Sequence, residues 1–600
     1  MSDLIEIIED RLADFTRDKR IITLSWMALI IGGLSALVAY ALVWLIAVIT
    51  NLAFYQQFSS VFQSPDHHRL GYWVVIVPVF GGLVIGLMAR YGSDKIRGHG
   101  IPEALEAILF GRSRMEPKIA VLKPLSSAIS IGTGGPFGAE GPIIMTGGAV
   151  GSIFAQFFHL SSAERKTLLV AGAAGGMSAI FAAPVAAALL AIELLLFEWR
   201  PRSFIPVAIA AVSASAIRVP LLGAGPIFPV HAHASLGGEG LLFAFMIGII
   251  AGLASGFLTN MVYGFEDLFT KLPIHWMWWP AIGGLCVGIG GLIEPSVLGV
   301  GYGTIHELLR GNIIGPSLLG ILIAKSIVWS IALGSGTSGG VLAPLLMMGG
   351  ALGATLAGFI PMGDHGLWAT IGMAAMMGGT MRSPLTAMIF TLELTQDLNL
   401  LPSLMIGCIA AHGVTVLLLR RSILTEKVAR RGYHIMREYS VDPLAMVRVG
   451  EVMDKNVPII PASMRLVDLS DRIASHDPHL ARHEGLLIID KNKELAGIIT
   501  RGDVLRALEQ NGRDGTTVLD AGSRDLIVTF PDEVLYEAAS KMLRNNIGRL
   551  PVVTRQNSRR IVGYLGRRHL MIGHLRRLED EHLRERRFAA ASSKESTTLI

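Results

Sequence analysis

Two glycine-rich segments of this 600-residue chain have residue types that bind an anion through backbone N–H groups. They read GAEGP at residues 138–142 and GGVLAP at residues 339–344, and each ends in proline. Glycine lets the backbone approach a ligand closely, and proline favours the first turn of a helix. A helix N-terminus offers free N–H groups and a partial positive charge. The pattern predicts two such N-termini, which hold a small dehydrated anion without a full positive charge that would trap it.

A third segment, GHGIP at residues 98–102, has the same character and places His99 at the predicted site. A neutral imidazole donates one N–H to an anion, whereas a protonated imidazole binds it more tightly and in a pH-dependent way. A histidine packed at the start of a helix is the alternative interpretation.

The two proline-ending segments lie in an internal repeat with an offset of about 200 residues. Residues 132–157 align without a gap with residues 334–359, and residues 172–194 then align with residues 372–394. Besides the glycines, the shared positions include Pro184 with Pro384 and Glu193 with Glu393. Transporters are often built from duplicated halves, with the substrate site between them near the middle of the membrane. We therefore expect the two helix N-termini to converge there.

The composition is typical of a membrane protein: 51% of the residues are hydrophobic, 16% are charged, and the mean hydropathy is +0.52. Stretches near the roughly 20 residues that cross a bilayer occur at 22–50, 72–90, 167–197, 203–222, 241–263, 317–333 and 402–419. The first stretch is too long for a signal-peptide core, so we predict a retained membrane helix. An acid such as Glu140 is costly in a membrane and functional by default, with a charge partner at a helix terminus as the alternative.

Basic residues flank both ends of this apolar region, namely Arg17, Lys19, Arg20, Arg420, Arg421 and Lys427. The positive-inside rule therefore predicts a multi-pass protein of the inner or plasma membrane with both termini cytoplasmic. The net charge of +5 reflects this orientation, and nucleic acid is not an expected partner. Cys286 and Cys408 lie in apolar stretches, so neither a disulfide framework nor a CxxC metal site is predicted.

The three glycine-rich segments resemble the signature loops of the chloride channel and chloride/proton antiporter (CLC) family, which read G-S-G-I-P, G-R/K-E-G-P and G-x-F-x-P. The resemblance covers roughly residues 20–435. It implies an all-α polytopic membrane domain at residues 21–435, built from two inverted repeats with many tilted and partial helices, after a cytoplasmic segment at residues 1–20. It also implies transport of chloride or a similar small anion, with or without protons, by a homodimer with one pathway per subunit.

The resemblance assigns roles to individual residues. Glu140 corresponds to the gating glutamate, whose carboxylate occupies an anion site and swings away to let an ion pass. The anion-binding positions are His99, Gly100, Gly138, Ala139, Gly141, Val341, Leu342 and Leu424. Two of them depart from the family, because His99 replaces a serine and Leu424 replaces a pore tyrosine. The inner anion site is therefore expected to be weaker or differently selective.

The resemblance leaves the proton route open. Antiporters of the family carry a second glutamate directly after the position of Glu193. This chain has Leu194 there. Channels of the family also have an apolar residue at this position. Glu198 lies one helical turn later and is a candidate relay from the same helix face. An interfacial glutamate paired with a neighbouring arginine is the alternative interpretation. Glu193 and Glu393 are expected to satisfy structural hydrogen bonds in each half. Because Leu194 favours passive conductance and Glu198 allows proton exchange, both mechanisms remain.

Beyond about residue 435 the hydropathy falls and strands alternate with helices. This part resembles two CBS modules, at residues 447–510 and 515–575. A charge-rich tail at residues 576–600 follows, which we expect to begin as a solvated helix and to end in disorder.

The CBS pair carries one candidate nucleotide motif. In members that bind adenine nucleotides, the Thr and Asp of G-x-x-T-x-x-D contact phosphate and ribose, and here they are Thr500 and Asp503. The second copy has Gly566 and His569 instead, so at most one nucleotide is predicted. A structural or dimerising tail is the alternative.

Other functions fit the sequence less well. A CBS-tailed magnesium transporter needs clustered acidic ligands within the membrane, and the few acids there lack such spacing. A fluoride-selective member of the same family also replaces the serine of the first loop, but the other two loops do not resemble that branch. The HExxH motif of a membrane protease does not occur, and no catalytic residue, metal site or required cofactor is predicted.

Overall fold

The computed structural model describes residues 20–111, 113–432, 444, 447–477, 480, 485–511 and 515–582. The chain divides into two compact units, one that extends to Tyr439 and one from Ser440 to Leu583, called here the membrane unit and the tail unit. Apart from Arg20, the predicted N-terminal segment lies outside the described residues, as does the predicted tail beyond His582.

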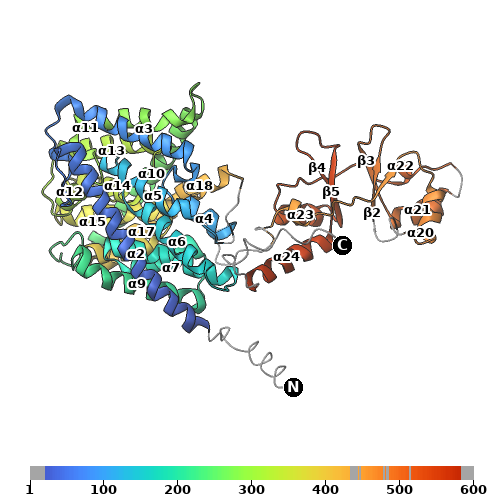
Figure 1. Cartoon of the computed structure of the whole chain (residues 1–600), viewed down its shortest axis with the longest axis horizontal. Coiled ribbons are helices and arrows are strands. Elements are labelled where there is room, and N and C mark those ends of the chain that lie inside the picture. The colour runs from blue at the N-terminus through green and yellow to red at the C-terminus, as the bar shows by residue number, and fades with distance from the viewer. Residues whose placement is uncertain are drawn as a thin grey trace, which may run out of the picture. The chain divides into compact units, whose positions relative to one another are not determined.

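The membrane unit consists of two sets of helices in the same order (Figure 1). The first set is α2 (Arg20–Thr50), α3 (Ile76–Tyr91), α4 (Ile101–Leu109), α5 (Pro117–Gly132), α6 (Glu140–Gln156), α7 (Ser162–Phe181), α8 (Pro184–Leu190) and α9 (Pro201–Leu222). The second set is α10 (Gly238–Thr270), α11 (Trp279–Ile293), α12 (Tyr302–Leu309), α13 (Pro316–Gly334), α14 (Leu342–Ala357), α15 (His365–Met381), α16 (Pro384–Thr395) and α17 (Leu401–Leu418), and α18 (Ile423–Arg430) follows.

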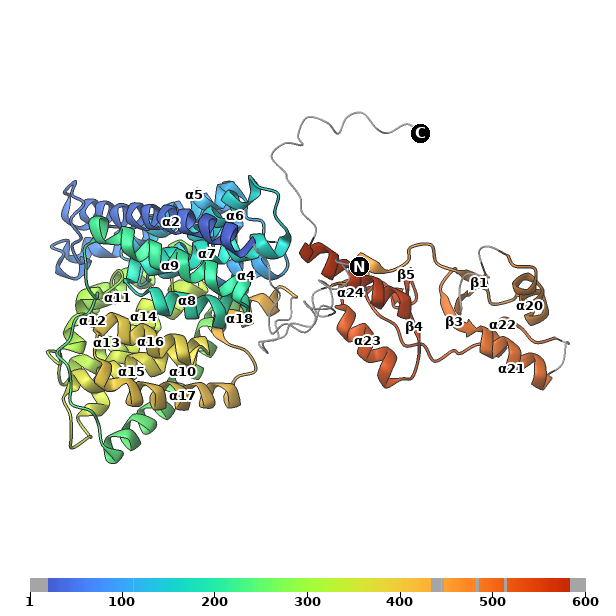
Figure 2. The same ribbon diagram turned by 90° about the horizontal axis from the view of Figure 1, so that it is seen from below.

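The two sets also pack in the same way. The contact of α6 with α7 recurs between α14 and α15, and that of α2 with α9 recurs between α10 and α17. Figure 2 shows α2, α7 and α9 on one side of the unit and α15, α16 and α17 on the other. The duplicated, all-helical membrane unit confirms the predicted fold class.

Among the described residues, seven helical segments are long and apolar enough to cross a bilayer: Arg20–Tyr55, Gly71–Tyr91, Pro201–Leu222, Gly238–Thr270, Trp276–Ile293, Pro316–Gly334 and Leu398–Arg430. All but Trp276–Ile293 overlap a predicted stretch. That segment contains α11, whose glycines and flanking tryptophans dilute the apolar signal. The apolar stretch that the sequence analysis omitted is therefore a candidate span.

The prediction of a single span at residues 167–197 is wrong. The stretch is divided between α7, which ends at Phe181, and α8, which begins at Pro184. Ala182 adopts a left-handed conformation with φ of 54°, and Pro184 lacks the N–H that a continuing helix would need. One residue of unusual backbone conformation thus ends the helix within an apolar run.

Glu193 and Glu393 connect the two halves. The Glu393 carboxylate accepts hydrogen bonds from the N–H groups of Val185 (3.0 Å) and Ala186 (2.7 Å) at the start of α8. The Glu193 carboxylate accepts from the N–H (2.9 Å) and the hydroxyl (2.6 Å) of Thr386 at the start of α16. Each acid therefore caps a helix N-terminus of the other half. The predicted structural hydrogen bonds are present, but they cross between the halves.

The tail unit contains two small sheets covered by helices (Figures 1 and 2). In the first sheet, β1 (Ile459–Pro461) pairs in parallel with β2 (Gly485–Ile489), which pairs antiparallel with β3 (Leu495–Thr500). In the second, β4 (Arg549–Val553) pairs antiparallel with β5 (Ile561–Gly566). The helices are α19 (Val449–Val452), α20 (Leu466–Ala474), α21 (Arg501–Asn511), α22 (Val518–Ala521), α23 (Leu535–Arg544) and α24 (Arg567–His582).

The first short helix of each sequence copy packs in the core of the other copy. Val518 of α22 packs in the core around Ile488, whereas Val449 of α19 packs in the core around Leu550. A third buried cluster, with members on β2, β3, β4 and β5, joins the two sheets. The predicted module boundaries follow the sequence repeat, and each core draws one helix from the neighbouring copy.

Candidate anion site

The three glycine-rich segments lie side by side in the membrane unit. The Gly138 N–H donates to the Gly340 carbonyl (3.3 Å), and the Gly340 N–H donates to the Gly138 carbonyl (2.8 Å). The Gly339 N–H donates to the Gly98 carbonyl (3.5 Å), which joins the first segment to this antiparallel pair. The backbone contacts bring the N-termini of α4, α6 and α14 together. The repeat predicted this for α6 and α14, and the third glycine-rich segment adds α4.

Two positions in these segments require glycine for different reasons. Gly100 precedes α4 with φ of 87°, a conformation that other residues rarely adopt. Gly141 lies so close to the first segment that a Cβ would be 1.9 Å from the His99 carbonyl oxygen. A side chain at Gly141 would therefore separate α6 from the loop before α4.

Glu140 is the first residue of α6, and its side chain is fully buried. Its Oε1 accepts hydrogen bonds from the N–H groups of Leu342 and Ala343 (3.1 Å for Ala343), in the first turn of α14. Its Oε2 has no hydrogen-bond partner among the described residues. The carboxylate thus occupies the position that an anion would take at the N-terminus of α14.

The space around this carboxylate exists because two residues lack side chains. A Cβ at Gly138 would lie 1.8 Å from Glu140 Oε2, and a Cβ at Gly340 would lie 2.6 Å from Glu140 Cδ. The two paired glycines and the N–H groups of Leu342 and Ala343 are called here the cradle. Its donors are neutral backbone groups, which is the kind of donor set that suits a small anion.

The other predicted residues differ in whether they offer a free hydrogen-bond donor. Ala139 precedes α6 and Val341 precedes α14, so both are N-cap residues. The Gly138 N–H is engaged with Gly340 and does not point to an anion. His99 is 2% exposed, and neither ring nitrogen has a hydrogen-bond partner in the described part of the chain.

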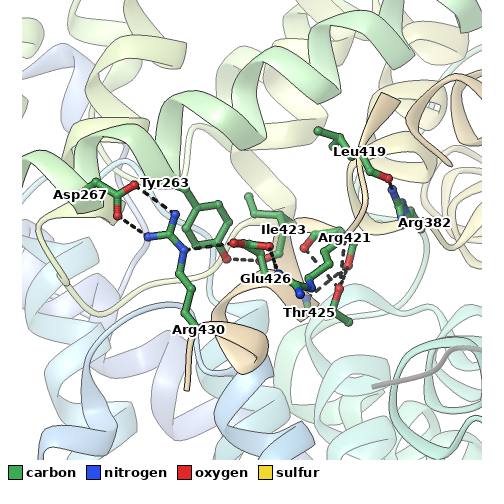
Figure 3. A network of polar contacts seen from close by, with 10 residues as sticks. Tyr263, Asp267, Arg382, Leu419, Arg421, Ile423, Thr425, Glu426 and Arg430 are labelled. Atoms are coloured by element: carbon green, nitrogen blue, oxygen red, sulfur yellow. Dashed lines mark hydrogen bonds and ion pairs between the residues drawn. The ribbon is translucent and has the colours of Figure 1, made fainter. Parts of the chain in front are cut away.

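Leu424 lies fully buried in α18, where its side chain offers no hydrogen bond. The preceding residue, Ile423, accepts a hydrogen bond at its carbonyl from the hydroxyl of Tyr263 on α10 (2.5 Å, Figure 3). Tyr263 was not predicted as a site residue. This phenol fixes the backbone next to the position at which the pore tyrosine is missing.

Ion pairs hold α18 between α10 and α4. Arg430 pairs with Asp267 of α10 and with Glu426 of α18 (3.2 Å for Glu426, Figure 3). Arg431, directly after α18, pairs with Glu103 of α4 (2.6 Å). Lys427 of α18 lies 3.8 Å from the same carboxylate. The Glu103 side chain is only 3% exposed, so these two cations are important, because an unpaired buried charge is strongly destabilising.

Two buried lysines were not predicted. Lys123 Nζ donates to the carbonyls of Ile96 (2.8 Å) and Gly98 (2.7 Å) and to the Ser338 hydroxyl (3.0 Å). It thereby ties the loop before α4 to the loop before α14. Lys325 is its counterpart in the repeat. The sequence did indicate this pair, because the ungapped alignment extends upstream and places the two lysines at equivalent positions within apolar stretches.

The prediction that Glu198 shares a helix face with the position after Glu193 is wrong. The π-helical segment Ala191–Leu196 ends the helix, and Phe197 is left-handed with φ of 54°. Glu198 follows in the connection to α9, where it accepts a hydrogen bond from Ser203 (2.7 Å) and lies 3.9 Å from Lys166. A π turn followed by a left-handed residue cannot be inferred from helical spacing.

In the tail unit, Thr500 and Asp503 hydrogen-bond to each other at the start of α21. The Asp503 carboxylate accepts from the N–H (2.9 Å) and hydroxyl (2.7 Å) of Thr500. In the second copy, the Gly566 N–H donates to His569 Nδ1 (2.9 Å). His569 thus takes the place of the aspartate in the backbone contact, but it offers no carboxylate for a ribose.

Comparison with known proteins yields one family for each unit. A family model described as voltage gated chloride channel matches residues 81–416, and the CBS domain model matches residues 449–510 and 518–573. Proteins named H(+)/Cl(-) exchange transporter ClcA, from Salmonella agona (strain SL483) and Salmonella typhi, are each 31% identical over 415 residues, covering 66% of this chain and 86% of the relative.

Solved structures show the same fold at lower identity. A slow cyanobacterial Cl-/H+ antiporter has a TM-score of 0.59 and 21% identity, covering 69% of this chain and 98% of that chain. A eukaryotic CLC transporter has a TM-score of 0.60 and 18% identity over 91% of this chain and 98% of that chain. A CLC-type fluoride/proton antiporter has a TM-score of 0.55 and 19% identity, covering 67% of this chain and 97% of that chain.

Substitution of Gly138 by alanine tests whether the cradle is sized for a carboxylate. The three atoms nearest to the added Cβ all belong to the flexible Glu140 carboxyl group, so Gly138→Ala should displace that group from Leu342 and Ala343 while the fold is kept. Cryo-electron microscopy of the variant would show the displacement. Gly303→Ala on α12 is the control, since a Cβ there meets nothing within 4 Å. An unmoved Glu140 in Gly138→Ala would contradict this description of the cradle.

Proposed function

Since this chain belongs to the voltage-gated chloride channel family and carries a tandem CBS pair, we propose that it moves chloride or a similar small anion across the membrane in exchange for protons, with Glu140 as the gate. The observation that carries the proposal is the Glu140 carboxylate on the N–H groups of Leu342 and Ala343. A carboxylate and a halide accept the same hydrogen bonds, so they compete for the cradle.

Proton coupling follows from the same competition. When the Glu140 carboxylate takes up a proton, it loses the negative charge that strengthens its hydrogen bonds to the α14 N–H groups. The neutral acid is then a weaker competitor, and an anion takes its place. The names of the H(+)/Cl(-) exchange relatives support this choice over passive conductance.

The inner proton route has Glu198 as its candidate relay. Leu194 is fully buried and cannot carry a proton, whereas the Glu198 carboxylate is in contact with Ser203 and within 3.9 Å of Lys166. Passive conductance remains the alternative mechanism. It predicts that Glu198 does not take up or release a proton during transport.

His99 and Leu424 are proposed to set anion preference at the inner end of the pathway. The ring nitrogens of His99 are buried and have no partner among the residues that the structure describes, so one N–H is available to an anion. Leu424 contributes only apolar surface. Gly100, Ala139, Gly141 and Val341 shape the backbone around the cradle.

The assembly follows the family. We propose a homodimer with a separate pathway in each subunit and with both termini in the cytoplasm, where the basic residues around Arg420 lie.

A CBS-tailed magnesium transporter is not favoured, because the matching family model is that of an anion channel. A fluoride-selective pathway is the second candidate, and replacing chloride by fluoride in the transport assay decides between them.

The CBS pair is proposed to bind one adenine nucleotide at Thr500 and Asp503. Asp503 should hold the ribose hydroxyls and Thr500 a phosphate, and the nucleotide would regulate transport. Asp503→Asn should weaken nucleotide binding by about tenfold or more, because the ribose loses a charged acceptor. Calorimetry with AMP, ADP and ATP measures this.

Asp520→Asn is the matched control, since Asp520 forms the same helix-capping contact with Thr517 at the start of α22, outside the motif. Binding of one nucleotide per chain that is lost only in Asp503→Asn supports the site. No binding, or two nucleotides per chain, would refute the proposal.

Flux measurements on Glu140 variants test the transport proposal. Liposomes with a chloride gradient should show chloride efflux together with uphill proton movement, followed with and without a potassium ionophore. Glu140→Gln cannot take up the proton, so proton movement should cease while chloride still moves at an altered rate. Glu239→Gln, an exposed acid in the first turn of α10, is the control. Chloride movement without protons in the unmodified protein would identify a passive pathway, and an unaltered Glu140→Gln variant would remove the gate assignment.

A further inference from the structure

A fourth helix N-terminus is constructed in the same way as that of α4. Gly301 precedes α12 with φ of 79°, as Gly100 precedes α4 with φ of 87°. Lys325 Nζ donates to the carbonyls of Val297 (2.8 Å) and Gly299 (3.1 Å) in the loop before α12, which repeats the contacts of Lys123 before α4. The first residue of α12 is Tyr302. In the second half, a tyrosine therefore occupies the helix start that is equivalent to that of α4.

The hydroxyl of Tyr302 is buried and has no hydrogen-bond partner within the part of the chain that the structure describes. Its ring packs edge-to-face against Phe228, with ring centroids 5.7 Å apart. Phe228 is fixed in turn, because it is 1% exposed and its N–H donates to the Leu394 carbonyl (3.0 Å). A buried hydroxyl without a partner is costly and rare in native structures. The fold holds the ring in place without using the hydroxyl.

A matching acceptor lies in the same region. Among the described residues, Glu140 Oε2 is also buried and also has no partner. The start of α12 packs against α14, since a Cβ at Gly301 would lie 1.9 Å from the methyl group of Met347 on α14, and the Glu140 carboxylate is bound at the N-terminus of that same helix. The Tyr302 phenol and the Glu140 carboxylate are also within range of electrostatic interaction. One unsatisfied donor and one unsatisfied acceptor thus lie near each other, on helix starts that belong to different halves.

We propose that the Tyr302 hydroxyl is the hydrogen-bond partner of the Glu140 carboxyl group when that group leaves the cradle. Tyr302 is a positioning residue of the gate, and this role rests on the proposed function of Glu140. In the cradle the carboxylate accepts from two N–H groups, and outside it the carboxyl group would accept from the phenol. The phenol lowers the free energy of the displaced position and so raises the fraction of time during which the cradle is open to an anion.

Tyr302→Phe is the test, because it removes the hydroxyl and keeps the ring against Phe228. Chloride efflux from liposomes should fall by about tenfold, which corresponds to about 1.4 kcal/mol, and calorimetry should show weaker chloride binding. Tyr55→Phe is the control, since its hydroxyl donates to the Ser64 carbonyl (2.5 Å) outside the site. In a Glu140→Ala background, Tyr302→Phe should have no effect, because no carboxyl group remains to be held.

Unchanged efflux in Tyr302→Phe, or equal slowing in the Glu140→Ala background, would overturn the inference. A structural readout separates it from the transport proposal. In Gly138→Ala the carboxyl group is forced from the cradle whether or not the protein transports, and it should then lie about 3 Å from the Tyr302 hydroxyl. That contact in a protein that moves no anion would refute the proposed transport alone. A displaced carboxyl group directed elsewhere would refute the role of Tyr302 alone.

Discussion

The backbone pair between Gly138 and Gly340 is the contact on which the anion site depends. It is made by one residue from each half, and it sets the N-terminus of α6 against that of α14. The favourable field of a helix N-terminus is confined to its first turn, so the two starts must approach this closely to act on one ion. Side chains at the paired positions would fill the space of the carboxylate. The contact therefore needs both halves of the duplicated chain.

Buried charges keep the paired loops in position. An ammonium group in a membrane interior is costly unless several acceptors surround it. Lys123 meets this need with two carbonyls and one hydroxyl, and Lys325 meets it with two carbonyls. The two ammonium groups thereby hold the loops before α4, α12 and α14 in position. Glu193 and Glu393 fix the halves to each other farther from the cradle.

The sequence predicted the features that arise from composition and repetition. Glycine and proline positions located the three loops, and the repeat implied that two of them would meet. It did not predict the break at Ala182 or the end of the helix at Phe197, because each depends on one residue in a left-handed conformation that neither residue type favours. The exchange of α19 and α22 between the tail cores could not be predicted either, since a helix of four residues is too short for its apolar pattern to indicate which core it joins. Lys123 was overlooked although its repeat partner was visible.

The central claim is that the Glu140 carboxylate and the transported anion occupy the same cradle. Bromide is a chemically close substitute for chloride with a distinctive anomalous signal, so crystals of Glu140→Ala grown in bromide locate the ion directly. The account predicts a bromide peak within hydrogen-bond distance of the Leu342 and Ala343 N–H groups in Glu140→Ala, and none there in the unmodified protein while the carboxylate is bound. A peak only at other positions in Glu140→Ala, or a bromide beside an undisplaced Glu140 on the same N–H groups, would contradict it.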